Sequence, residues 1–398
     1  MEASLQRGKS NYFLLIGTVF LRFFGDSLFY AFLARYLKTL PFLSWQLSVL
    51  TMAIPIMGML GSAFLAFFGS TTKRRRHIYL GLFSLECLVV AFFGFRDEFW
   101  YVLLFDMIAN FCTGPSFSII DTFIVGATDR AKKTYASARR FGTLGYIVGV
   151  IGGGYLISFL SDKWTFFIGG CLMLTASILF LVLRFDQKDE ELARTREEKP
   201  NFFRNFGALM HIKNYLLFLF AFSLAEGMYL ATDTAFSLFT VDLGIEDHIF
   251  GYAFGGAIIV EFIIMLFFRK SFGRKKMKWA LLLGAISQIL RPALFAIPFD
   301  YPYVYLFFEF LHGVSVGFFL AALLPYLREI VGEELLYPAF FFFGLLRYTL
   351  TAAMNFAVPL MADSVGYSPV FWILAGGSLL GFLLILPIRL EEPIEEAA

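Results

Sequence analysis

Charged residues are scarce in this sequence. Asp, Glu, Lys and Arg make up 16% of its 398 residues, against about 25% in a typical soluble domain. Apolar residues reach 59%, and the chain contains 53 phenylalanines. This number of charged residues is too small to form the polar surface of a soluble globular protein. The composition therefore excludes that class and indicates an integral membrane protein.

Cysteines and catalytic motifs are also scarce. The three cysteines, Cys87, Cys112 and Cys171, lie inside apolar runs, where we interpret them as small packing residues and not as a disulfide framework. The sequence has no nucleotide-binding loop of the form G-x-x-x-x-G-K-[ST] and no zinc-protease motif H-E-x-x-H. We therefore expect no enzyme, no metal site and no organic cofactor.

Twelve apolar runs fill most of the chain. A helix needs roughly 20 mostly apolar residues to cross a bilayer, and each run is close to that length or longer. The sequence therefore predicts an all-α integral membrane protein with twelve transmembrane helices. The runs lie at about 12–34, 44–69, 78–95, 99–126, 141–160, 165–183, 214–240, 249–268, 279–298, 303–327, 338–362 and 369–388.

The longest polar stretch lies between the sixth and seventh runs and divides the helices six and six. Its sequence, FDQKDEELARTREEKPNFFRNF, has mixed charges and a proline, which is typical of a solvated linker. We predict an N-terminal six-helix bundle at 1–184, a cytoplasmic linker at 185–213 and a pseudo-symmetric C-terminal six-helix bundle at 214–398. Repeated six-helix halves are typical of secondary transporters, whose solute sites lie between the halves.

Basic residues are distributed unevenly between the two sides of the predicted bundle. The N-terminus and every second loop hold 26 of the 33 Lys and Arg residues. The opposite side has only Arg35, Lys38, Arg96 and Lys163. Because Lys and Arg accumulate in cytoplasmic loops, we expect a multi-pass protein of the cell membrane with both termini in the cytoplasm. The same distribution explains the net charge of +2 without a nucleic-acid partner.

Glycines recur every three or four residues in the fifth and eighth runs. Gly142, Gly145 and Gly149 follow this spacing in the fifth run, and Gly251 and Gly255 follow it in the eighth. Small residues at such intervals let two helix backbones approach closely within a membrane. We interpret these glycines as helix-packing seams.

Ionisable residues inside the apolar runs are the main candidates for function. A charge at the centre of a membrane helix costs on the order of 3 kcal/mol, so it normally pairs or lines a water-filled cavity. Eight carboxylates stand against four arginines and one histidine. Because a buried carboxylate without a partner takes up a proton, this excess predicts proton coupling. The residues are Arg22, Asp26, Glu86, Asp106, Asp121, Arg139, Glu226, Asp233, Glu261, Arg291, Glu309, His312 and Arg347.

Spacing along the helices suggests which of these charges pair. Arg22 and Asp26 are four residues apart, so they share one face of the first helix. Arg347 has no acid within a helical turn. We therefore expect its partners on other helices, with Asp233 and Glu309 as the first candidates.

Arg139, Asp121 and Tyr146 form the clearest candidate binding site. Arg139 lies in the segment ARRFGTLGY, and Tyr146 follows seven residues later, which is two helical turns, so both side chains share a face. An acid and a guanidinium together can hold several hydroxyl groups, and an aromatic ring can stack on the apolar face of a sugar. The pattern therefore predicts a site for a sugar or a glycosylated small molecule.

These motifs resemble those of the major facilitator superfamily, and in particular the lactose permease type of oligosaccharide/proton symporters with their nucleoside and phenylpropionate relatives. ARRFGTLGY is similar to the permease motif of an arginine, then Phe-Gly, then Gly-aromatic. The resemblance places Arg139 on the sugar-binding arginine and Asp121 on the sugar-binding glutamate. It places Tyr146 on the tryptophan that stacks on the sugar.

The second half resembles the proton machinery of the same permeases. YLATDTAF places Asp233 on an aspartate of the seventh helix, LRPALFA places Arg291 on the arginine of the ninth, and FEFLHG places His312 on the histidine of the tenth. Arg347 falls near the lysine of the eleventh helix. Glu261 is similar to the glutamate of the nucleoside permease branch.

Two departures from this resemblance alter the expected proton path. Ser315 replaces the proton-carrying glutamate that follows the histidine, and Glu309 stands where the permeases have a lysine. We therefore expect Glu309 or Glu261 to take the proton role. Aspartate and tyrosine in place of glutamate and tryptophan in the sugar site argue against lactose itself as the solute.

The sequence thus predicts a monomeric secondary active transporter that carries a sugar or glycoside together with protons by alternating access. Asp121, Arg139 and Tyr146 are the predicted solute ligands. A nucleoside or aromatic-acid proton symporter is the first alternative, followed by a membrane-embedded enzyme and a non-transporting membrane sensor. The predicted coupling network is Asp233, Glu261, Arg291, Glu309, His312 and Arg347.

Overall fold

The computed structural model describes residues 2–68, 72–130, 135–182, 202–268 and 274–386. These residues form helices joined by short connections, and the same ranges contain no β-strand. The first half has α1 (Glu2–Tyr30), α2 (Leu33–Thr39), α3 (Ser44–Phe68), α4 (Thr72–Phe92), the 3₁₀ turn η1 (Phe93–Phe95), α5 (Phe99–Arg130), α6 (Tyr135–Leu160) and α7 (Asp162–Val182). The second half has α9 (Phe202–Met210), α10 (Lys213–Asp242), α11 (Asp247–Phe268), α12 (Arg274–Ala296), α13 (Val304–Phe308), α14 (Phe310–Val365) and α15 (Tyr367–Ile385).

The helices provide the twelve membrane crossings that the apolar runs predict. Within the described ranges, nine helical segments are long and apolar enough to span a bilayer, and Leu80–Phe95 and Val304–Phe319 are shorter apolar helices at the third and tenth positions. α5 supplies the remaining crossing. α14 contains two crossings, because Gly332 has a φ of +75° and interrupts the helix between them. A positive φ is easily adopted only by glycine.

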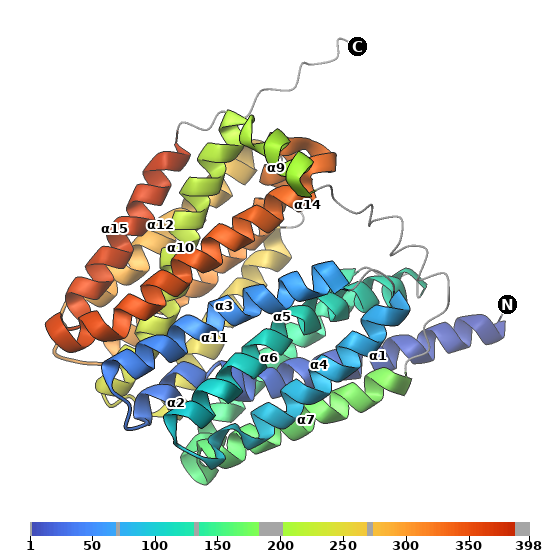
Figure 1. Cartoon of the computed structure of the whole chain (residues 1–398), viewed down its shortest axis with the longest axis horizontal. Helices are drawn as coiled ribbons and strands as arrows, with labels where there is room; N and C mark the ends of the chain where they lie inside the picture. Colours follow the sequence, from blue (N-terminus) through green and yellow to red (C-terminus); the bar gives the residue numbers. More distant parts are fainter. Residues whose placement is uncertain (1, 69–71, 131–134, 183–201, 269–273, 387–398) are drawn as a thin grey trace.

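The crossings pack as two groups of helices (Figure 1). In the first group α1 packs against α6 and α7, and α4 packs against α5 and α7. In the second group α10 and α12 each pack against α14 and α15. The exact domain bounds of 1–184 and 214–398 stay a prediction, because most of the linker between them lies outside the described residues.

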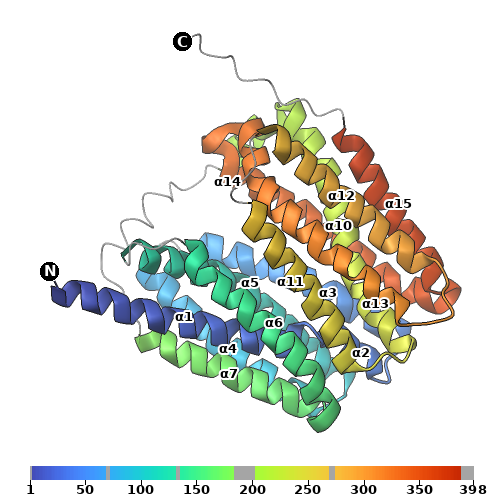
Figure 2. The ribbon, with the colours of Figure 1, turned by 180° about the vertical axis from the view of Figure 1, so that it is seen from behind.

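Two extensive helix contacts join the groups, and the short helix α2 also packs against α10. α3 packs against α14, and α11 packs against α6. Figure 1 shows α3 in front of this boundary and Figure 2 shows α11 in front of it, so the two contacts lie on opposite faces of the protein. Glycine permits the second contact, since a Cβ atom on Gly154 would lie 2.5 Å from the carbonyl oxygen of Asp247. The packing seam predicted for the fifth run is confirmed on the side of α1, where a Cβ atom on Gly145 would lie 2.4 Å from the carbonyl oxygen of Phe20.

The outer and inner surfaces of the helices differ in polarity. The side chains of Phe159, Phe267 and Phe307 are 81%, 75% and 77% exposed on the outside, where a bilayer replaces water as the solvent. Arg22 and Arg291 are 1% and 0% exposed inside. Because buried charges are expensive in a membrane protein, these interior residues are where a function is expected.

Candidate functional site

The first half buries a charge cluster around Glu86 on α4. Its two carboxylate oxygens accept hydrogen bonds from Nη2 of Arg22, at 2.9 and 3.0 Å. The hydroxyls of Tyr30 and Thr113 donate to Oε1 at 2.9 and 2.6 Å, and the hydroxyl of Ser116 donates to Oε2 at 3.1 Å. These donors fill the hydrogen-bonding capacity of Glu86. Glu86 therefore serves to hold Arg22 in position.

Arg22 also binds Asp26, one turn further along α1, which confirms the pair predicted from their spacing. Asp26 has fewer partners than Glu86, because its Oδ2 atom is buried and accepts no hydrogen bond from the described part of the chain. The positive charge of Arg139 on α6 also acts on Asp26. The first half thus places two acids on one buried arginine.

The second half buries a matching cluster around Arg291 on α12. Its Nε and Nη2 atoms donate to both carboxylate oxygens of Glu309, at 2.8 to 3.1 Å. Its Nη1 atom donates to Oδ1 of Asp233 on α10 at 2.5 Å. A bidentate contact of this kind matches the planar guanidinium to the planar carboxylate. Arg291 therefore joins α10, α12 and the start of α14 through one fixed charge.

His312 connects this cluster to Tyr229. The Nδ1 atom of His312 lies 3.1 Å from Oδ1 of Asp233 and 2.7 Å from the hydroxyl oxygen of Tyr229. One ring nitrogen either donates a proton or accepts one. A protonated Nδ1 donates to Asp233, whereas an unprotonated Nδ1 accepts from Tyr229. The geometry can therefore hold a proton in two hydrogen-bonding arrangements.

Arg347 has a different partner from the two that its spacing suggested. Its Nη1 atom lies 3.8 Å from Oε2 of Glu226 on α10, and Glu226 also accepts a hydrogen bond from Gln288 on α12. The expectation that Arg347 binds Asp233 or Glu309 is therefore wrong. Arg291 forms ion pairs with both of those acids. Arg347 instead contacts Glu226, which lies two turns before Asp233 on α10.

The structure brings Arg139 and Asp121 together. The Nε atom of Arg139 lies 3.6 Å from Oδ1 of Asp121, and the two side chains are 31% and 46% exposed. The ring of Phe23 on α1 lies 4.1 Å from the guanidinium carbon of Arg139. A guanidinium above an aromatic ring and beside an acid is both held in place and open on one side. This pair is therefore more accessible than Arg22 and Arg291, although Asp233 of the second cluster is also partly exposed.

Tyr146 and Glu261 lie between the two halves. The charges of Asp26, Asp233 and Glu261 all act on the hydroxyl of Tyr146. The charges of His312 and Arg139 both act on the carboxylate of Glu261. Tyr146 lies on α6 and Glu261 on α11, and these two helices pack against each other across the boundary.

Glu261 differs from the other acids of this region in its lack of a direct partner. Within the described part of the chain, it forms no hydrogen bond and no ion pair. It is partly exposed on α11, the helix that packs against α6 of the first half. Because Glu261 makes no fixed bond, its carboxylate is available to bind a proton or a ligand.

Asp233, Glu309 and His312 also have the spacing of a metal site. Each offers a ligand atom, and these atoms lie within 4.8 Å of one another. Arg291, however, donates to both carboxylates. A guanidinium keeps its charge at any physiological pH and repels a metal cation. The chemistry of the group therefore favours an ion-pair network.

A polar latch closes one end of the boundary between the halves. Arg35 on α2 donates from Nε to Oδ1 of Asp247 at 2.8 Å, from Nη1 to Oγ1 of Thr240 at 2.6 Å and from Nη2 to the carbonyl oxygen of Ile245 at 2.7 Å. We call these four residues the Arg35 latch. Two further contacts across the boundary at this end are Lys38–Asp242 at 2.9 Å and Ser44–Asp363 at 2.7 Å.

Sequence reasoning missed several neutral members of these clusters, among them Tyr30, Tyr229 and Gln288. A tyrosine inside an apolar run is compatible with lipid contact or packing, so its presence in the sequence did not indicate membership of a polar cluster.

Sequence reasoning also missed a motif in the tenth run. The segment Gly313 to Gly317, GVSVG, has the spacing G-x-S-x-G of serine hydrolases. That segment lies inside α14, not on a strand-to-helix turn, and Ser315 is fully buried there without a partner in the described chain.

Two curated relatives are transporters. Residues 12–353 match the MFS_1 like family. The uncharacterized transporter YwbF of Bacillus subtilis (strain 168) is 25% identical over 327 residues, which cover 81% of this chain and 79% of the relative. Multidrug resistance protein 2 of the same strain is 24% identical over 260 residues, or 63% of this chain and 62% of the relative.

Solved transporter structures share the fold. The nucleoside transporter NupG aligns with a TM-score of 0.77 at 17% identity, over 94% of this chain and 98% of NupG. The xylose transporter XylE from E. coli aligns with a TM-score of 0.71 at 14% identity, over 96% of this chain and 97% of XylE. With the family match over most of the chain, these findings show that the protein belongs to the MFS_1 like family and is a multi-pass membrane transporter of the major facilitator fold, not an enzyme.

Proposed function

We propose that this transporter carries a sugar or glycoside together with protons by alternating access. In alternating access the two halves expose a central site first to one side of the membrane and then to the other. Support comes from the position of the candidate residues, since Tyr146 on α6 and Glu261 on α11 lie on the two helices that pack across the boundary, and Arg139 pairs with Asp121 on the first-half side. This convergence is the observation that carries the proposal.

The Arg139–Asp121 pair is the proposed solute site. Its partial exposure allows a ligand to reach both side chains. The guanidinium and carboxylate can together hold adjacent hydroxyl groups, and Tyr146 offers a ring and a hydroxyl at the boundary. In this proposal Arg139 and Asp121 bind the polar edge of the solute and Tyr146 binds its ring face.

The proton is proposed to bind Glu261. Glu309 was the other proton-binding candidate from the sequence, but it forms a bidentate ion pair with Arg291. Glu261 has no such partner, and the charges of Arg139 and His312 act on it from either half. Proton binding would remove one negative charge from the boundary, so it can bias which state of the transporter is populated.

The remaining network residues are proposed to transmit the proton's effect. Arg291 holds Asp233, and Asp233 lies beside His312. A change of protonation at His312 exchanges its bond to Asp233 for one to Tyr229. Arg347 binds Glu226 one layer further along α10. These contacts link α10, α12 and both crossings of α14, which are the helices that must move together.

The Arg35 latch suggests which state the structure represents. It closes the end of the boundary formed by α2 and the α10–α11 connection. If both termini are cytoplasmic, as the distribution of basic residues predicts, this end faces away from the cytoplasm. We propose that the protein is a monomer in the cell membrane and that its structure is the state with the outer end closed.

Uptake into proteoliposomes tests the proposed function. The purified protein is reconstituted and given an imposed pH gradient with a panel of radiolabelled monosaccharides, disaccharides, nucleosides and aromatic acids. The proposal predicts that a sugar or glycoside accumulates and that an uncoupler abolishes the accumulation. Accumulation of none of these sugars, with gradient-driven export of drugs instead, would contradict it; one relative is named a multidrug resistance protein.

A nucleoside symporter is the second candidate, favoured by one observation. Glu261 is unpaired at the boundary, and the sequence around it is similar to the nucleoside permease branch. A nucleoside presents ribose hydroxyls that suit Arg139 and Asp121, and a base that can stack on an aromatic ring. Accumulation of nucleosides without any sugar in the same panel would select this candidate.

A further inference from the structure

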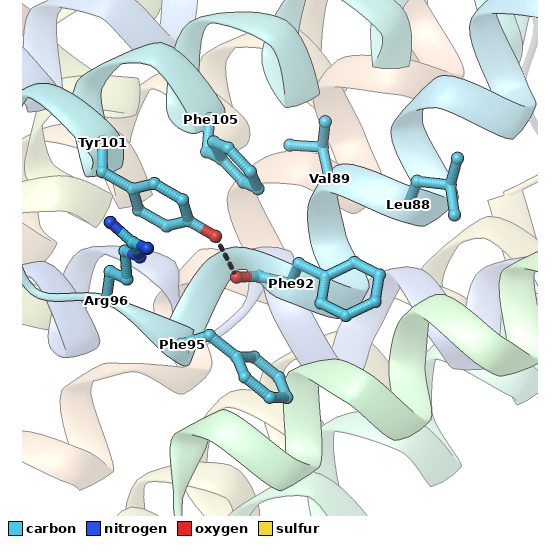
Figure 3. Close-up of a pocket in the computed structure, with 7 residues that line it drawn as sticks. All are labelled: Leu88, Val89, Phe92, Phe95, Arg96, Tyr101 and Phe105. Atoms are coloured by element: carbon cyan, nitrogen blue, oxygen red, sulfur yellow. Dashed lines mark hydrogen bonds between the residues drawn. The ribbon is translucent and has the colours of Figure 1, made fainter.

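A groove outside the proposed transport site opens on the outer surface between α4 and α5. Its volume is about 480 Å³. Figure 3 shows Arg96 and Tyr101 at one end of this groove, Phe105 and Phe92 in the middle, and Val89 and Leu88 toward the other end. The groove therefore has one cationic end and one apolar end.

The walls of the groove are fixed by specific contacts. The hydroxyl of Tyr101 donates to the carbonyl oxygen of Phe92 at 2.6 Å, which ties α5 to the end of α4 (Figure 3). The ring of Tyr101 stacks on Phe105 with 4.0 Å between centroids. Gly94 in η1 packs so closely on α7 that a Cβ atom would lie 2.9 Å from Cα of Lys163. The groove is therefore built into the fold.

Aromatic residues place the cationic end of the groove at the surface of the bilayer. The side chains of Trp100 and Trp164 beside it are 74% and 48% exposed, and tryptophan accumulates at the level of the lipid headgroups. From Phe92 to Leu88 the groove continues one helical turn along α4, about 6 Å into the hydrocarbon region. The position of the groove matches the part of a lipid where the headgroup meets the acyl chain.

The charges around the cationic end suit a phosphate group. Arg96 is exposed at the end of the groove, and the ammonium of Lys163 lies 4.3 Å from the ring centroid of Phe95, which also lines the groove. Two acids follow Arg96 in the chain. Asp97 accepts a hydrogen bond from Tyr36 at 3.3 Å, and Glu98 immediately precedes α5. A guanidinium binds phosphate through two parallel hydrogen bonds.

We propose that this groove binds one glycerophospholipid, with its phosphate on Arg96 and one acyl chain along Phe92, Phe105 and Leu88. Lys163 adds a second positive charge beside the phosphate. A soluble phosphate compound would leave the apolar end exposed, and an uncharged lipid would leave Arg96 without an anion. An amphiphile with an anionic group at the headgroup level satisfies both ends.

Native mass spectrometry of the full-length, delipidated protein tests this proposal. Phosphatidylglycerol, phosphatidylethanolamine and diacylglycerol of the same chain length are titrated into wild type, Arg96→Gln, Leu88→Trp and Arg328→Gln. Arg328 is a matched control, because it is an exposed arginine paired with Glu333. Thermal melting of each variant shows that the fold is retained.

We expect one tightly bound phospholipid on the wild type and on Arg328→Gln. Arg96→Gln should weaken its binding about tenfold, since a charge-assisted hydrogen bond is lost. Leu88→Trp should weaken both phospholipids by filling the apolar end. Diacylglycerol should bind weakly to every variant. Equal phospholipid binding by wild type, Arg96→Gln and Leu88→Trp, or equal loss in Arg328→Gln, would overturn the proposal.

Discussion

Arg35 and Asp247 are 212 residues apart in the sequence, yet the Nε atom of one lies 2.8 Å from a carboxylate oxygen of the other. They belong to different halves of the protein, and the side chain of Arg35 is almost fully buried in the contact. Its three guanidinium nitrogens donate to Asp247 on α11, to Thr240 on α10 and to the carbonyl oxygen of Ile245 between these helices. We therefore expect the stability of this contact to set how easily the two halves separate at that end.

Arg35→Gln is predicted to open this end of the boundary. The change leaves Asp247 and Thr240 without their donor, and the loss of a partly exposed ion pair with its hydrogen bonds is worth about 1–2 kcal/mol. Spin labels at Thr39 and Glu246, both exposed, should show a longer distance in a cysteine-free background. Lys163→Gln, a cation at the same end, is the control. An unchanged distance distribution in Arg35→Gln would show that the latch does not hold the halves together.

Glu309→Gln is predicted to destabilise the second half. Arg291 is fully buried, and the change removes the acid that binds it with two oxygens. Removal of one partner of a buried ion pair costs about 3–5 kcal/mol, so the melting temperature in detergent should fall clearly. Glu246→Gln is the control, because that carboxylate is 63% exposed. Identical melting of the two variants would mean that the Arg291 cluster contributes little to folding.

Arg139→Lys is predicted to lose solute binding while it keeps the fold. Lysine preserves the charge but not the planar fork that holds two hydroxyl groups, so affinity should fall at least about tenfold. Since Arg139 is 31% exposed, stability should change little. The matched control is Arg140→Lys, which alters an exposed neighbour on the same helix. Titration calorimetry with the transported solute distinguishes the two, and equal affinities would remove Arg139 from the site.

Gly145→Ala is predicted to disrupt the packing of α6 on α1. An added Cβ atom would lie 2.4 Å from the carbonyl oxygen of Phe20, whereas a Cβ atom on Gly152 would meet no atom within 4 Å. Gly145→Ala should therefore lower the melting temperature and the yield, because two backbones must move apart. Gly152→Ala on the same helix should melt like the wild type. The reverse order would contradict the packing described here.

The membrane crossings could be predicted because their signal is local. A run of about 20 apolar residues is visible without knowledge of any contact. The Arg22–Asp26 pair was predictable for the same reason, since four residues along one helix fix the geometry. Where two adjacent apolar runs form the single α14, the sequence still places both crossings, but not the glycine that joins them.

Contacts between helices were only partly predictable. Arg347 binds Glu226 and not the acids first expected, because the rotation of α10 against α14 decides which acid an arginine reaches. The contact of Arg139 with Asp121 was expected from family resemblance and is present. The binding of Arg22 to Glu86 was not anticipated, although both residues were candidates. Charge counts identified the participants, but only the packed structure assigns the pairs.

Transport by Glu261→Gln in proteoliposomes tests the central claim most directly. Wild type, Glu261→Gln and the exposed control Glu333→Gln are compared for pH-driven accumulation and for solute exchange without a gradient. We expect Glu261→Gln to exchange solute but not to accumulate it, because a glutamine cannot bind and release the coupling proton. Accumulation by Glu261→Gln at the wild-type level would contradict the claim that protons act through this carboxylate.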